Sequence, residues 1–168
     1  KIDTFTISGA EKMGEEPLLK LFKIGEADMM LVNYFTNKDL FTETEFKQGL
    51  DSLSNYYFDL GYMDFKIVNI DSKLNVAKEK ISIDIQVSEG IQYKLGAITF
   101  DGGSEIFNKD ELSELISLNE GDIFNRNTIV KDIQTLTDMF ADKGYAYVDI
   151  NPMTSDFLDS INIDFKIS

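Results

Sequence analysis

Neither cysteine nor histidine occurs in the 168 residues of the chain. Their absence excludes thiol catalysis, Ser-His-Asp triads, histidine general bases and the usual zinc sites. The lack of cysteine is compatible with an oxidising compartment, although small cytosolic proteins also lack this residue. No apolar run approaches the roughly 20 residues of a membrane-spanning helix. The enzyme classes that depend on cysteine or histidine side chains are thereby excluded.

Basic residues are also scarce, with 16 Lys and Arg against 30 Asp and Glu. Both halves of the chain are net negative, which disfavours nucleic acid and anionic membrane surfaces as partners. What the chain does contain is 43% apolar and 12% aromatic residues. This composition argues against a disordered tail and predicts a folded protein with a substantial core.

One stretch of the sequence is partly repeated 83 residues later: YYFDLGYMDFKI (Tyr56–Ile67) is similar to MFADKGYAYVDI (Met139–Ile150). The identities are Asp59, Gly61, Tyr62 and Ile67 with Asp142, Gly144, Tyr145 and Ile150. Each copy is preceded by apolar residues at helical spacing, at 46, 50, 53 and 57 and at 129, 133, 136 and 140. The glycine then ends the helix, because it tolerates the left-handed conformation found just past a helix terminus.

After each glycine the apolar period changes to two, which predicts strands over Met63–Ile70 and Tyr145–Pro152. Loops at 71–79 and 154–159 separate these from cleaner strands at 80–88 and 160–168. Upstream, each copy has a strand ending in glycine and a short amphipathic helix. We therefore predict an α+β fold with two tandem β-α-α-β-β domains, 1–90 and 91–168, each with two helices covering one face of a three-stranded sheet.

The copies differ between their two helices, where the first has about ten extra residues within 26–41. The apolar residues of this segment include Met29, Met30, Leu31, Tyr34 and Phe35. They either pack on their own domain or form an exposed contact surface.

The order of elements, the two DxGY sequences at 59–62 and 142–145, and the junction SEGIQYKLGAITFDG from Ser88 to Gly102 resemble the POTRA domains of outer-membrane β-barrel assembly proteins. The resemblance covers essentially the whole chain, and EGxxY at Glu89–Tyr93 is its most specific part. NYF followed by TETEF before the first long helix resembles the third POTRA domain, which makes the second copy similar to the fourth. The chain begins with Lys1 at a strand, so we expect a segment of a longer protein.

The resemblance implies a periplasmic scaffold without catalytic activity or cofactor, in a protein where several POTRA domains precede a C-terminal membrane barrel. It implies that the domains receive unfolded outer-membrane β-barrel proteins and bind accessory assembly lipoproteins. It also implies mixed sheets in which the last strand is central and the strand after each GY is an edge. An edge strand can accept an extended partner through main-chain hydrogen bonds.

The predicted partner-binding edge is Met63, Asp64, Phe65, Lys66, Ile67, Val68, Asn69 and Ile70. Asp64 and Lys66 are equally what a protein uses to discourage uncontrolled pairing, so a protected edge stays open as an alternative. The second copy is the weaker candidate, because Pro152 cannot donate a main-chain hydrogen bond.

Structural roles are expected for Gly61, Tyr62, Gly144 and Tyr145, as a helix stop followed by an aromatic ring packed at the helix-sheet seam. A short interdomain joint with limited bending is expected at Glu89, Gly90, Ile91, Gln92 and Tyr93. This segment does not have the Ser/Gly-rich composition of a flexible linker.

Three other functions remain open. A two-partner secretion or translocation transporter shares the repeat, a carboxylate or metal-dependent enzyme needs converging acidic residues, and a repeat adhesin needs surface exposure. The acidic groups in sequence, such as Glu11 with Glu15 and Glu16, lack the alternation of a calcium loop and are best explained as solvated faces, so no metal site is predicted.

Overall fold

A computed structural model of the chain describes residues 2–22, 43–75, 77 and 80–168. Its contacts divide the chain into two compact units, Lys1–Tyr57 with Asp64–Gly90 and Phe58–Met63 with Ile91–Ser168. We call the DxGY segments at 59–62 and 142–145, where each long helix ends, the corners. The corner of the first copy groups with the second unit, whereas the sequence-based division ran from 1 to 90 and from 91 to 168. The apolar residues predicted as a possible second contact surface, at 29–35, lie outside the described residues.

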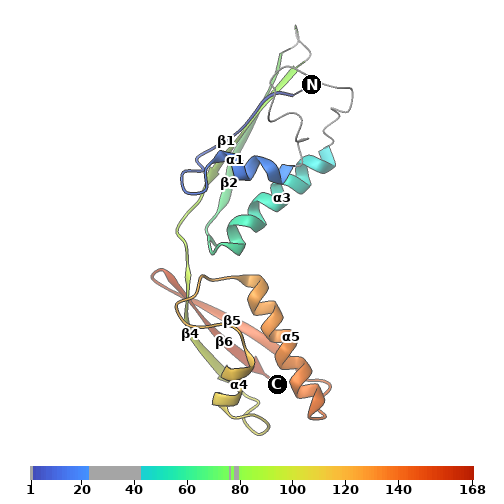
Figure 1. The fold of residues 1–168 in the computed structure, drawn as a ribbon, viewed down its shortest axis with the longest axis vertical. Coiled ribbons are helices and arrows are strands. Elements are labelled where there is room, and N and C mark those ends of the chain that lie inside the picture. Colours follow the sequence, from blue (N-terminus) through green and yellow to red (C-terminus); the bar gives the residue numbers. More distant parts are fainter. Residues whose placement is uncertain (1, 23–42, 76, 78–79) are drawn as a thin grey trace. The chain divides into compact units, whose positions relative to one another are not determined.

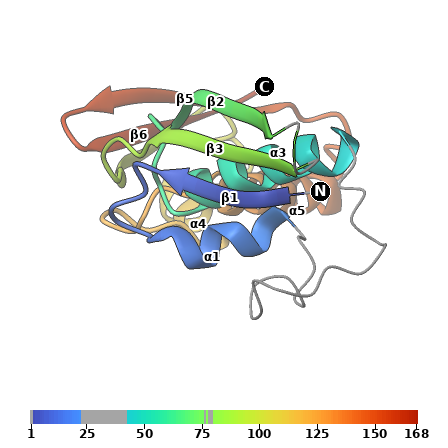
Figure 2. The same cartoon turned by 90° about the horizontal axis from the view of Figure 1, so that it is seen from above.

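Both units contain a three-stranded sheet. The elements of the first unit are β1 (Ile2–Ser8), α1 (Glu15–Leu19), η1 (Lys20–Phe22), α3 (Glu43–Asp59), β2 (Lys66–Asn75) and β3 (Lys80–Ser88). Those of the second are β4 (Lys94–Asp101), α4 (Lys109–Leu115), α5 (Arg126–Asp142), β5 (Ile150–Phe157) and β6 (Ser160–Ile167). The strand orders are β1-β3-β2 and β4-β6-β5, so the last strand of each unit is central (Figures 1 and 2).

Each sheet is mixed, because the first strand pairs in parallel with the central strand and the remaining strand pairs with it in antiparallel. Helices cover one side of each sheet, as Figure 1 shows for α1 and α3 beside the strands of the first unit. The structure confirms the predicted α+β class and the repeated β-α-α-β-β order.

The long helix of the first unit packs its predicted apolar stripe against the sheet, with Leu53 and Tyr57 fully buried. The same helix contacts Phe22 of η1 at Gly49, where an added Cβ atom would overlap the ring. Phe22 also contacts Phe5 and Phe46, with ring centroids 4.9 and 6.1 Å away. The glycine therefore allows the helix to lie directly on an aromatic cluster.

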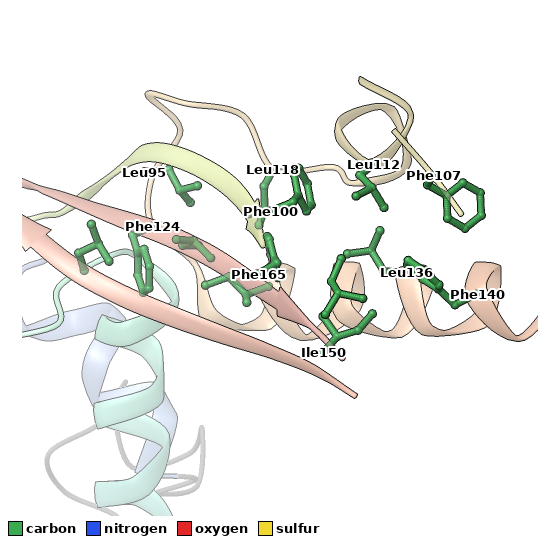
Figure 3. Packing of buried hydrophobic residues seen from close by; sticks show 14 residues of the cluster. Leu95, Phe100, Phe107, Leu112, Leu118, Phe124, Leu136, Phe140, Ile150 and Phe165 are labelled. Atoms are coloured by element: carbon green, nitrogen blue, oxygen red, sulfur yellow. The ribbon is translucent and has the colours of Figure 1, made fainter. Parts of the chain in front are cut away.

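The core of the second unit lies between its sheet and the helices α4 and α5 (Figure 3). Helix α5 contributes Ile129, Leu136 and Phe140, and the strands contribute residues such as Phe100 and Phe165, whose rings stack 5.6 Å apart. Asn108 caps α4 through a reciprocal pair of hydrogen bonds with Glu111. Asn125 caps α5 by accepting from two backbone amides. These caps satisfy amide groups that a helix N-terminus leaves without intrahelical partners.

The strands after the two corners begin later and run further than the sequence predicted. β2 covers Lys66–Asn75 and β5 covers Ile150–Phe157, whereas the predicted strands were 63–70 and 145–152. In both copies a turn at 63–64 or 146–147 separates the corner from the strand. Residues 71–75 and 154–157, which the sequence placed in hairpin loops, are strand. The side chains at 71–74 and 154–157 are exposed, so their polar character reflects exposure to solvent.

Candidate partner-binding edge

β2 forms one edge of the first sheet, since it pairs only with β3 among the described strands (Figure 2). Its outer side therefore presents main-chain groups that no strand of the described chain pairs. The structure places five of the eight predicted edge residues, Lys66–Ile70, in this strand. Such an edge is able to extend the sheet by accepting another chain.

The other three predicted edge residues precede the strand. Met63 and Asp64 form the turn, and Met63 packs against the core of the second unit to which it belongs. Phe65 is buried, and its ring stacks on Tyr57 with the centroids 4.1 Å apart and the planes inclined by 9°. Phe65 thus anchors the start of the strand to α3.

A β-bulge interrupts β2 at Val68. Ile67 is opposite Val87 and Asn69 is opposite Gln86, so Val68 is one extra residue between two paired positions. The bulge changes which residues face the helices, from odd positions before it to even positions after it. This change explains why alternation that began at Met63 did not predict the strand beyond Ile70.

Sequence reasoning missed the outer half of the edge, from Asp71 to Asn75. The available signal was the alternation that restarts at Ile70 and continues through Ser72 and Leu74. Cross-strand partners share a face of the sheet. Ile70 is opposite Ile85, which is fully buried under the helices, so Ile70 and Leu74 lie on the helix-facing side.

The helix-facing side is only partly covered near the end of the β2-β3 hairpin. Leu74 is 63% exposed, Ile70 is 38% exposed and Ile81, which is opposite Leu74, is 37% exposed. We call these three residues the apolar margin. Ile70 and Leu74 lie in the edge strand, where an additional strand would place its own side chains beside them, and Ile81 is their neighbour in the central strand.

The opposite, open face carries two carboxylates in one cross-strand row. Asp71 of β2 is opposite Asp84 of β3, which is opposite Thr6 of β1. The hydroxyls of Thr6 and Ser8 donate hydrogen bonds of 2.7 and 3.1 Å to Asp84. The Thr6 hydroxyl is the main cause that lowers the pKa of Asp84 below its ordinary value of 3.8, while desolvation opposes this shift.

The corresponding edge of the second unit, β5, has a different character. Pro152 is opposite Phe165 and Asp156 is opposite Ile161, so both lie in rows with buried residues of β6. A proline and a charge on the helix-facing side are two of the features that protect an edge strand from pairing. β5 also keeps a continuous register with β6, without the bulge of β2.

Glu89, predicted as part of the interdomain joint, is bonded within the first unit. It is buried in the first unit, where it accepts hydrogen bonds from the Tyr57 hydroxyl and from the Lys12 backbone amide. The Lys12 ammonium donates to the Gly90 carbonyl at 2.7 Å. Glu89 and Gly90 thus hold the loop after β1, whereas Ile91, Gln92 and Tyr93 belong to the second unit.

The two corners are similar in backbone and different in exposure. Gly61 and Gly144 have φ values of 83° and 96°, the left-handed region that favours glycine. Tyr62 is only 6% exposed, but Tyr145 is 52% exposed. Tyr145 lines a hollow of about 540 Å³ in the second unit, together with residues including Gly103, Ile106 and Tyr147.

Within the described ranges, no group of three or more acidic side chains gathers to hold a metal ion. No helix in that part of the chain is long and apolar enough to cross a membrane.

Comparison with known proteins identifies the family. The model of the POTRA family, described as a surface antigen variable number repeat, matches residues 1–90 and 93–168. The outer membrane protein assembly factor BamA of Neisseria meningitidis serogroup B is 24% identical over 167 residues, which is 99% of this chain and 21% of that protein. BamA of Buchnera aphidicola is 25% identical over 169 residues, 99% of this chain and 27% of that protein.

A solved structure has the same fold. The crystal structure of the POTRA3–5 region of Haemophilus influenzae BamA superimposes with a TM-score of 0.70 at 24% identity, covering all of this chain and 65% of that one. The chain spans about a fifth to a quarter of the length of the two curated relatives. With the family model matching nearly every residue in two consecutive segments, the chain belongs to the POTRA family.

Proposed function

We propose that this chain is a periplasmic binding and scaffold module of outer-membrane protein assembly. It engages unfolded outer-membrane β-barrel proteins and accessory lipoproteins by accepting an extended segment at the outer side of β2. The module needs no cofactor and performs no catalytic step. In the parent protein, neighbouring POTRA domains and a C-terminal membrane barrel complete the machinery.

The observation that carries this proposal is the contrast between the two antiparallel edges. β2 has an apolar margin on its helix-facing side, whereas β5 has Pro152 and Asp156 on the corresponding side. The bulge at Val68 is compatible with either a protected or a used edge. The uncovered Leu74 and Ile70 favour use, because burying them against an added strand removes apolar surface from water.

Main-chain recognition suits a receptor for many clients. Hydrogen bonds between backbones require an extended partner but little particular sequence. The two curated relatives are named outer membrane protein assembly factor BamA. That name favours assembly over a related translocation transporter as the setting of this module.

Site-specific photocrosslinking in the parent protein tests the proposal. A photoreactive residue replaces Lys73 on β2 or, as the matched control, Ser155 on β5; both positions are exposed on the open face of an edge strand. We expect crosslinks to outer-membrane clients or lipoproteins at position 73 that are much weaker at position 155. Ile67→Pro distorts β2 and is expected to reduce them. Equal crosslinking at the two positions, or crosslinks unaffected by Ile67→Pro, contradicts the proposal.

We also propose that the two units are the third and fourth POTRA domains of their parent. The longer segment between the helices of the first unit supports this order, and so does the likeness to a POTRA3–5 structure. The sequence of the parent gene tests it directly. Two POTRA repeats upstream and one between this chain and the barrel are expected, and any other number is inconsistent with these ordinals.

A further inference from the structure

We propose that β2 selects a particular kind of extended segment: an amphipathic strand with apolar side chains on one face and a lysine or arginine on the other, placed beside Asp71. This inference rests on the proposed function, because it concerns the chemistry of the segment that adds to β2.

The register defines rows of side chains that an added strand would continue. On the helix-facing side the rows end at Ile70, Ser72 and Leu74. Ile70 and Leu74 belong to the partly exposed apolar margin. Directly opposite side chains on adjacent strands lie about 5 Å apart and interact. Apolar residues of an added strand would therefore extend the core at these two rows.

On the open face the rows end at Asn69, Asp71 and Lys73. The central row contains Thr6, Asp84 and Asp71, and its inner carboxylate is already satisfied. Asp84 accepts hydrogen bonds from Thr6 and Ser8 on the β1 side, away from β2. Asp71 is exposed, and it forms no ion pair or side-chain hydrogen bond with any residue that the structure describes.

Like charges directly opposite each other in a sheet are destabilising. Asp71 therefore has Asp84 as an unfavourable neighbour on one side and the open edge on the other. A cation on an added strand would be a favourable neighbour for Asp71 and would offset this repulsion. An acidic residue at the same position would add a third carboxylate to the row.

The pleat determines the spacing of the preferred segment. Adjacent residues point to opposite faces, so the cation beside Asp71 and the apolar side chains beside Ile70 and Leu74 fall on different faces of one alternating strand. The edge consequently fits strands of alternating apolar and polar residues and disfavours uniformly apolar or acidic ones.

The test measures binding of two synthetic nine-residue peptides to the 168-residue chain. Both alternate apolar residues with polar ones, and they differ only at the central polar position, beside Asp71, which carries Lys or Glu. The other polar positions carry Thr, because a charge there would lie beside Lys73 and confuse the comparison. Amide shifts in β2 locate the bound peptide, and fluorescence anisotropy gives the affinities. We expect the Lys peptide to bind more tightly, and Asp71→Lys to weaken its binding about three- to tenfold while strengthening binding of the Glu peptide.

Two features separate this effect from unfolding and from general charge. Asp71→Lys places a cation opposite Asp84, so the variant is expected to be at least as stable as the parent. Asp156→Lys, at an exposed position of β5, changes the net charge equally and is expected to alter affinity less than twofold. An equal loss with Asp156→Lys overturns the inference, because the preference is then a general attraction to an acidic protein.

The outcomes also distinguish this inference from the function on which it rests. If both peptides shift β2 with equal affinity and Asp71→Lys changes neither, the charge preference is wrong and strand addition stands. If neither peptide perturbs β2, the proposed augmentation itself is contradicted, and the preference fails with it.

Discussion

The hydroxyl of Tyr57, at the end of α3, donates a 2.7 Å hydrogen bond to Oε1 of Glu89, just after β3, and both side chains are buried. Glu89 also accepts from the backbone amide of Lys12 at 3.0 Å. One carboxylate thus joins the helix, the end of the sheet and the loop after β1. The conspicuous EG pair after β3 therefore has a structural role inside the first unit.

Tyr57→Phe removes this hydrogen bond while leaving the ring stacked on Phe65. Because the acceptor is a buried carboxylate, we expect the unfolding free energy of the first unit to fall by about 1–3 kcal/mol. Urea unfolding followed by NMR signals from each unit measures the change separately. Tyr56→Phe removes the same atom from the half-buried neighbouring ring and is expected to have little effect. An equal loss of unfolding free energy in both variants would show that the hydrogen bond from Tyr57 to Glu89 adds no stability of its own.

Asp132 plays a comparable part in the second unit. Its carboxylate is buried and accepts from the backbone amides of Ser117 and Leu118 and from the Ser117 hydroxyl, at 2.8–3.0 Å. Asp132→Ala leaves these donors without their acceptor, so we expect a loss of about 3 kcal/mol or more. Asp138→Ala, on the exposed side of the same helix, is the control and is expected to cost less than about 0.5 kcal/mol. A small effect of Asp132→Ala would mean that water replaces the carboxylate.

Substitutions at two glycines of the second unit distinguish the energetic cost of backbone strain from the cost of steric overlap. Gly102 and Gly144 have similar φ values of 94° and 96°. A Cβ atom at Gly102 would overlap the carbonyl oxygen of Ile167, whereas at Gly144 it would meet nothing within 4 Å. We expect Gly144→Ala to cost about 1 kcal/mol and Gly102→Ala about 3 kcal/mol or more, measured by chemical unfolding. Equal costs would show that the overlap relaxes without penalty.

The acid stability of the first unit should depend on Thr6. Its hydroxyl lowers the pKa of Asp84, so ionised Asp84 stabilises the folded state above the ordinary pKa of 3.8, and this stabilisation is lost as the pH falls through the lower folded value. Thr6→Val raises the pKa of Asp84 toward its ordinary value. The variant should therefore be less stable than the parent at pH 7, with a difference that shrinks below about pH 4.

Carbon-detected NMR titration of the Asp84 carboxyl and urea unfolding at pH 7 and pH 3 measure both effects. Thr4→Val, at an exposed position on the same strand, is the control and should leave the Asp84 titration unchanged. A stability difference for Thr6→Val that persists undiminished at pH 3 would contradict the role assigned to the hydrogen bond.

The repeat, the order of elements and the class of fold follow from the sequence alone. These depend on local periodicity: Leu53 and Tyr57, or Leu136 and Phe140, are spaced by helical geometry and are buried where that spacing predicts. Gly61 and Gly144 end their helices for an equally local reason, since their left-handed backbone disfavours other residues. The family resemblance rested on the same corner and junction residues.

The residues that form the edge, and the neighbours of each, depend on pairing between strands that are distant in the sequence. The bulge at Val68 shifts the alternation of β2, and whether a bulge forms depends on pairing with β3 rather than on the sequence of β2 alone. The row that places Asp71 opposite Asp84, and Asp84 beside Thr6, joins residues from three strands. Such rows follow from register across the sheet, which no local pattern in the sequence contains.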